Sequence, residues 1–134
     1  MFGAAFDVLT KMPERVADSS SRQRADQLVD EAGWAAVRSD SPERERLAYL
    51  LGAISDLGAH LDPQDWRRYL DLVDSLGAFE VNRLHPEDPA ADRDVLLRRM
   101  VVGQVVFGEL VLSLRRLAHA HHSAQRASGI ARRP

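Results

Sequence analysis

The chain of 134 residues has the length of one ordinary domain, and its composition, 45% hydrophobic and 28% charged, is typical of a protein with a folded core. It contains no cysteine, which excludes disulfides, cysteine-ligated zinc, iron–sulfur clusters and thiolate nucleophiles. The N-terminus lacks the basic start and the uninterrupted apolar run of a signal peptide. We therefore expect a cytoplasmic protein without a membrane span.

Charge is distributed unevenly along the chain. Residues 1–94 carry 19 acidic and 11 basic side chains, whereas residues 95–134 carry seven arginines and a single acidic residue, Glu109. The net charge therefore changes from −8 in the first segment to +6 in the second, although the whole chain has a net charge of only −2. The sequence is therefore a charge dipole, acidic toward the N-terminus and basic toward the C-terminus.

Hydrophobic residues recur at three- and four-residue steps in the first part of the chain, and this spacing predicts helices. Residues 2–16 contain the first predicted helix, with Phe2 and Phe6 on its apolar face, and Gly3 and Pro13 indicate that it is short and followed by a break or kink. The serine run at positions 19–21 is expected to cap a second helix over residues 22–37, because a serine hydroxyl accepts from an amide of the first turn.

The next two predicted helices each begin with a polar residue followed by proline, which is a typical helix start. Ser41 is expected to cap a helix over residues 42–60. Asp62 is expected to cap a helix that begins at Pro63 and either ends at Gly77 or continues until His85. Both segments carry apolar side chains at helical spacing, so each is predicted to pack one face against a core.

The last predicted helix, residues 90–125, follows a connector rich in proline and acid at residues 85–92. Its middle, residues 101–112, has almost no polar face, and such a helix must be surrounded by protein or lipid. We predict an all-α, single-domain bundle of about five helices over residues 1–126, with this long helix as the central element and a basic tail at residues 127–134. Part of the same helix is alternatively a homo-oligomer interface.

No nucleophile beside a base, inward-facing pair of carboxylates or glycine-rich phosphate loop is apparent in the sequence. We therefore predict a non-enzymatic interaction or regulatory protein that binds a protein partner or itself and uses no cofactor and no metal. Large apolar side chains are the usual anchors of such interfaces. The predicted interface residues are Phe2, Phe6, Trp66, Val102, Val106 and Phe107.

One alternative is an accessory nucleic-acid-binding protein with a C-terminal arm rich in arginine and histidine. Arginines near the end of the last helix are suited to contact phosphates without reading sequence. The acidic first two thirds of the chain and the absence of a cationic recognition helix weigh against this alternative. The arginines concerned are Arg115, Arg116, Arg126, Arg132 and Arg133.

A second alternative is an enzyme or metal protein built around Glu109 and the histidines at positions 119, 121 and 122. A carboxylate inside an apolar helix is costly unless it is paired or exposed. Zinc generally requires three or four ligands, and the sequence supplies no second element with paired ligands. A solvated Glu109, and His119, His121 and His122 solvated beside the C-terminal end of a helix, are therefore the favoured interpretation.

Overall fold

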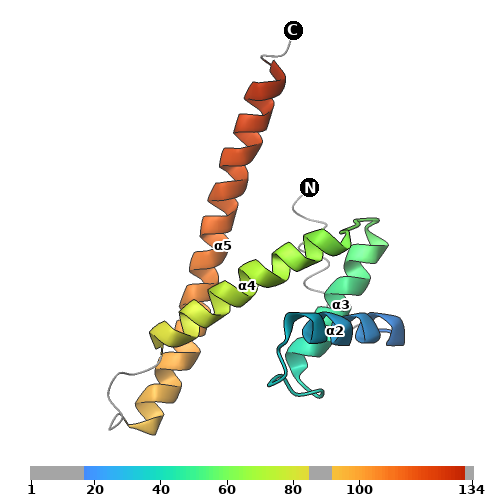
Figure 1. Cartoon of the computed structure of the whole chain (residues 1–134). Coiled ribbons are helices and arrows are strands. Elements are labelled where there is room, and N and C mark those ends of the chain that lie inside the picture. Colours follow the sequence, from blue (N-terminus) through green and yellow to red (C-terminus); the bar gives the residue numbers. More distant parts are fainter. Residues whose placement is uncertain (1–16, 85–91, 132–134) are drawn as a thin grey trace. The chain divides into compact units, whose positions relative to one another are not determined.

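The computed structural model describes residues 17–84 and 92–131 of the chain. The protein is all-α, as the hydrophobic spacing predicted, and the described residues form four helices and no strand (Figure 1). The predicted first helix, residues 2–16, lies outside the described residues. The helices are α2 (Ser19–Ala32), α3 (Pro42–Asp56), α4 (Pro63–Leu84) and α5 (Arg93–Ala131).

Side chains cap the starts of all four described helices, and at α5 Asp92 Oδ1 accepts from the amide of Asp94 at 3.2 Å. Ser41 caps α3, as predicted. At the start of α4, Asp62 Oδ1 accepts from the amide of Asp65 at 2.9 Å and Asp65 Oδ2 accepts from the amide of Asp62 at 3.1 Å, a reciprocal capping box. The cap of α2 is Asp18, which accepts from the amide of Ser21 at 2.7 Å. The serines that we expected to cap this helix therefore lie inside its first turn.

Two helices end before the predicted residue. Helix α2 ends at residue 32 and not near residue 37, and α3 ends at residue 56 and not near residue 60. A glycine with a left-handed backbone follows each end closely, Gly33 with φ +75° and Gly58 with φ +70°. This conformation is easy only for glycine, and it turns the chain so that later amides reach the last carbonyls of the helix.

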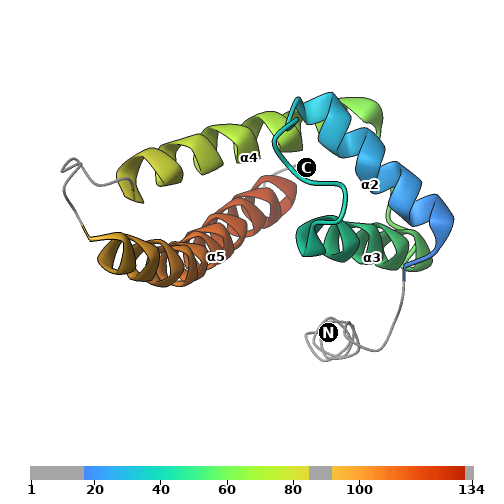
Figure 2. The ribbon, with the colours of Figure 1, turned by 90° about the horizontal axis from the view of Figure 1, so that it is seen from below.

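The chain divides into two units, residues 1–75 and 76–134, with the boundary inside α4. In the first unit α2 and α3 lie side by side, as both Figure 1 and Figure 2 show. Leu28 is the largest fully buried side chain of the described residues, and alanines on both helices let the two backbones approach closely. The buried hydrophobic residues are Ala17, Ala25, Leu28, Val29, Ala48 and Leu51.

The first half of α4 is attached to this two-helix core by apolar and polar contacts. Trp66 and Leu70, both half-buried, pack against the core. The indole N–H of Trp34 donates to Asp74 Oδ1 at 2.8 Å, and the guanidinium of Arg24 lies 5.9 Å from the centre of the Trp66 ring. These contacts hold the residues of α4 up to position 75 on the first unit.

Two ion pairs join α2 and α3 at the edge of the core. Arg22 binds the carboxylate of Glu45 with a shortest distance of 2.8 Å, and Arg44 binds Asp26 at 2.9 Å while it donates to the carbonyl oxygen of Val37 at 2.8 Å. The hydrogen bond from Arg22 is the largest cause of a lowered pKa of the Glu45 carboxyl group. The Arg22–Glu45 pair is therefore a source of pH-dependent stability in this unit.

We predict that the first unit loses stability in acid. The pKa of Glu45 and that of Asp18 are lowered in the folded state, so their stabilisation is complete above the unfolded pKa values, near pH 4, and disappears as the pH falls through the folded values. Thermal unfolding from pH 7 to pH 3, followed by tryptophan fluorescence, measures this loss. Glu45→Gln should flatten the profile, whereas Glu43→Gln on the same helix should leave it steep. Equal profiles for the two variants would contradict the assignment.

Helix α5 is 39 residues long, about 58 Å at 1.5 Å per residue. It continues to Ala131, beyond the predicted end at residue 125, so residues 127–131 of the predicted tail are helical. None of its side chains described between Arg93 and Gly129 is buried, and the predicted central position of this helix inside a bundle is therefore not confirmed. None of the described helices combines the length and the apolar run that a membrane span requires.

Candidate interaction surface

The second unit exposes large hydrophobic side chains from the end of α4 along most of α5. Exposure reaches 62% at Val101, 63% at Val105 and 67% at Leu117. The large hydrophobic residues classed as exposed in this unit are Leu76, Phe79, Val81, Val95, Leu97, Met100, Val101, Val102, Val105, Val106, Leu110, Leu114 and Leu117.

The area of this surface is comparable with that of a protein interface. If each of the thirteen side chains offers on the order of 100 Å² when fully exposed, about half exposure leaves roughly 700 Å² of apolar surface in water. Monomeric proteins rarely expose contiguous apolar patches above roughly 600 Å², and one partner of a standard interface contributes about 800 Å². Because these side chains lie on several sides of α5, a partner has to contact more than one side of the helix to bury the whole area.

Contacts inside the second unit cover only part of α5. The side chain of Leu84, at the end of α4, stands over Gly103 so closely that a Cβ atom there would overlap it. Leu96 and Phe107 are half-buried, whereas Leu110 and Leu114, further along, are exposed. Glycine at position 103 is therefore what allows α4 to approach α5 at this point.

The structure does not place the predicted interface residues on one surface: three lie on α5, one packs in the first unit, and two are outside the described residues. Val102 and Val106 are exposed and Phe107 is half-buried, all three on α5. Trp66 packs instead against the core of the first unit. Phe2 and Phe6 lie outside the described residues.

Leu114 and Leu117, with exposures of 54% and 67%, were not among the predicted interface residues. They follow Leu110 at steps of four and three residues, and this spacing is the signal that could have identified them. The apolar surface therefore extends further toward the C-terminus than the segment 101–112 on which the prediction was based.

The C-terminal half of α5 is cationic. Arg115, Arg116 and Arg126 are exposed, and the sequence holds no acidic residue after Glu109. Five of the seven arginines between residues 17 and 75 form ion pairs, whereas within the described part of the chain none of the arginines of α5 does. Arg132 and Arg133 lie outside the described residues.

The residues of the enzyme or metal alternative are exposed on α5. Glu109 and His119 face solvent, and the rings of His121 and His122 lie 5.1 Å apart in an edge-to-face contact. Across the ranges 17–84 and 92–131, no group of three or more histidine, aspartate or glutamate side chains is placed to hold a metal ion. The geometry of the described residues thus supplies no metal centre to this alternative.

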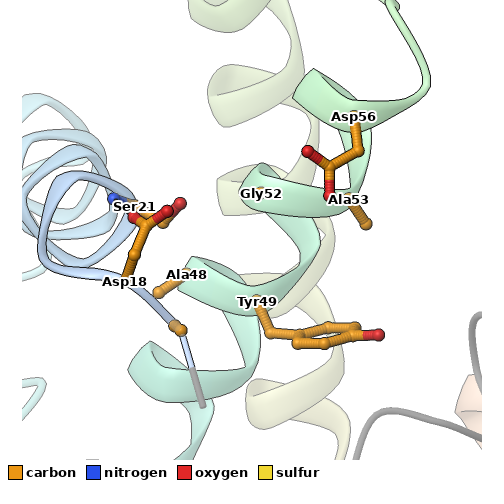
Figure 3. Close-up of a pocket in the computed structure, with 8 residues that line it drawn as sticks. Asp18, Ser21, Ala48, Tyr49, Gly52, Ala53 and Asp56 are labelled. Carbon is orange, nitrogen blue, oxygen red and sulfur yellow. Dashed lines mark hydrogen bonds between the residues drawn. The ribbon is translucent and has the colours of Figure 1, made fainter. Parts of the chain in front are cut away.

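A separate pocket of 260 Å³ lies in the first unit, where α2 begins beside α3. Figure 3 shows Asp18 and Ser21 on one side and residues of α3, among them Tyr49, Gly52 and Asp56, on the other. A Cβ atom on Gly52 would lie 3.2 Å from Ser21 Oγ, so glycine permits the close approach of the two helices.

The carboxylate of Asp18 in this pocket has a structural role. The hydrogen bonds that it accepts from the backbone and the side chain of Ser21 are the main causes of its lowered pKa. A carboxylate held as the cap of a helix stabilises that helix, so we assign Asp18 to the fold and not to a catalytic task.

The chain was compared with protein-family models, with curated proteins and with solved structures. None of the three comparisons gives a match. Function therefore has to be argued from the surfaces described above.

Proposed function

We propose that the protein is a non-enzymatic interaction protein that self-associates in the cytoplasm through the apolar surface of its second unit. This surface comprises the end of α4, residues 76–84, and the α5 residues 95–117. The proposal assigns the protein no reaction of its own. Its activity is to bring copies of the chain, and the partners that they carry, together.

One observation carries the proposal: α5 is rich in large apolar side chains, and none of its described side chains is buried. Val101 and Leu110, both exposed, lie on opposite sides of the helix because nine residues at about 100° each make two and a half turns. The exposed half of each side chain becomes favourable to bury once a partner is present. A partner that covers several sides of α5 is therefore expected.

A second copy is the simplest partner for such a surface. Two copies related by a two-fold axis present the same apolar patch to each other, which closes the assembly without a further protein. The packing of amphipathic helices around α5 would then be completed between chains, as in a helical bundle. Residues 93–109 contain both acidic and basic side chains, so like-charge repulsion between two copies comes mainly from the arginines that follow Glu109.

The proposal is tested by sedimentation of the purified full-length chain over a range of concentrations. Each chain has a mass of 15.0 kDa, so self-association predicts particles of twice this mass or more that dissociate on dilution. A mass of one chain at every concentration would rule out self-association.

Nucleic-acid binding is kept as a second candidate function because the arginines of α5 form no ion pair among the described residues. We predict that Arg115→Gln combined with Arg116→Gln lowers the affinity for mixed-sequence duplex DNA and reduces the slope of log K against log salt by about 2, because two phosphate contacts are lost. Fluorescence anisotropy measures both quantities. The matched control replaces Arg46 and Arg68 of the first unit, which also lack ion pairs in the described part of the chain. Equal losses in the two double variants would contradict a DNA surface on α5.

A further inference from the structure

We infer that the partner of α5 is the α5 helix of a second copy, packed antiparallel so that the midpoints of the two helices meet. This inference rests on the proposed self-association and specifies its geometry. It concerns one face of α5, which we call the seam. The seam residues are Leu96, Met100, Gly103, Phe107, Leu110, Leu114 and Leu117.

The seam follows the pattern of a coiled coil. Its members alternate between steps of four and three residues over three heptads, the repeat with which two helices interlock side chains along their length. Leu84 of α4 stands over Gly103 and supplies the apolar surface that the glycine lacks. From Leu110 to Leu117 the seam is exposed, so a partner helix has access to it.

The charges of α5 favour the antiparallel orientation. A parallel pair would bring the cationic C-terminal halves together, with Arg115, Arg116 and Arg126 beside their counterparts and no acidic residue after Glu109 to offset them. An antiparallel pair places each cationic half beside the other copy's first half, which is less cationic because Asp94 and Glu109 partly offset its three arginines, Arg93, Arg98 and Arg99. The antiparallel arrangement also points the two helix dipoles in opposite directions, so that the positive end of each lies beside the negative end of the other.

The spacing and the helix length indicate one antiparallel register. Residue 112 is the middle of α5, which runs from residue 93 to residue 131. If the axis passes at this level, the last four seam positions meet in pairs, whereas Gly103, Met100 and Leu96 lie level with His121, Ala124 and Ser128 of the second copy. Leu110 then lies level with Leu114 of the second copy, and Phe107 lies level with Leu117.

The positions that flank the seam agree with close packing in this register. Val106, Val111 and Ser113 are small or β-branched, so the helices can approach without a charged pair between them. Glu109 lies level with Arg115 of the second copy, and the like-charged Arg98 and Arg126 are also level with each other. A shift by one heptad toward the C-terminus would instead set Arg115 level with Arg116 of the second copy, which is repulsive.

Single cysteines test the orientation, because the natural chain has none. In the inferred register Met100 is level with Ala124 of the second copy, whereas two Ala124 residues are about 36 Å apart at 1.5 Å per residue. Met100→Cys and Ala124→Cys proteins are treated with a short thiol cross-linker, each alone and after mixing and exchange. We expect linked dimers in the mixture and at least about tenfold less in either protein alone. The register control mixes Phe107→Cys with Ala124→Cys.

Each outcome has a distinct meaning. Linking of each single-cysteine protein to itself shows parallel helices and overturns the inference while self-association stands. Preferential linking of the Phe107→Cys mixture shows a register shifted by one heptad and overturns the inferred midpoint. Oligomers by light scattering that fail to link show that another surface associates, which also overturns the inference. Monomers by light scattering, with no linking, overturn the proposed function itself.

Discussion

Replacement of Leu117 by glutamate is expected to convert the associated protein into monomers with unchanged helix content. Leu117 is 67% exposed within its own chain, so the monomer loses little packing, whereas each copy of the dimer would bury an uncompensated carboxylate. We expect self-association to weaken by at least about 100-fold, because each 1.4 kcal/mol of lost interface energy costs a factor of ten. Light scattering coupled to size exclusion gives the mass, and circular dichroism gives the helix content.

The matched control is Ser123→Glu, which adds the same charge to the same helix outside the seam. Ser123 is exposed and lies on the polar side of the C-terminal half of α5. Its variant should associate like the natural protein. If both variants associate normally, the seam is not the interface, and if Leu117→Glu unfolds the protein, α5 is covered within its own chain.

Replacement of Leu28 by alanine is expected to have the largest effect on folding stability. Leu28 is 1% exposed and lies between α2 and α3 in a core with few other large side chains. Removal of a buried leucine side chain costs about 2–5 kcal/mol of unfolding free energy. Both tryptophans of the chain, Trp34 and Trp66, lie in this unit, so chemical unfolding followed by fluorescence reports on it directly.

Leu57 provides the comparison for this experiment because its exposure is 72%. Leu57→Ala removes the same atoms from the surface and should change the unfolding free energy by less than about 0.5 kcal/mol. Similar losses in the two variants would contradict the placement of the core between α2 and α3. Self-association through α5 should persist in Leu57→Ala.

The class of fold followed from the sequence because helix starts are encoded locally. Ser41 before Pro42, and Asp62 before Pro63, combine a side-chain cap with a residue suited to the first turn, and the structure begins helices at both places. Gly77 lies inside α4 and does not end it, because the helix continues to Leu84. The sequence left this point open, since a single glycine weakens a helix without breaking it.

The sequence predicts helix ends less well than helix starts, because apolar residues at helical spacing follow the glycines that end α2 and α3. Gly33 and Gly58 end their helices through a left-handed backbone, although apolar residues continue the helical spacing beyond them. An apolar side chain at the right spacing predicts which face is buried but does not show that the helix continues. The local backbone preference of glycine prevails at both ends.

The burial of α5 could not be predicted from its sequence, because the same apolar pattern suits a core within one chain and an interface between chains. Val102 and Val106, for example, would be expected at the same positions in a core and in an interface. The role of Trp66 was equally open, since a large aromatic side chain anchors cores as well as interfaces. Its packing against the first unit became visible only when α2, α3 and the start of α4 were placed together.

Hydrogen exchange at two protein concentrations tests most directly whether a second copy covers α5. Self-association through α5 predicts that amides of residues 110–126 are protected at high concentration and exchange much faster on dilution, because no side chain described in this segment is buried within its own unit. Amides of residues 21–32 and 46–56, in α2 and α3, should exchange at the same rate in both samples. Protection of residues 110–126 that does not change with concentration would contradict self-association through α5.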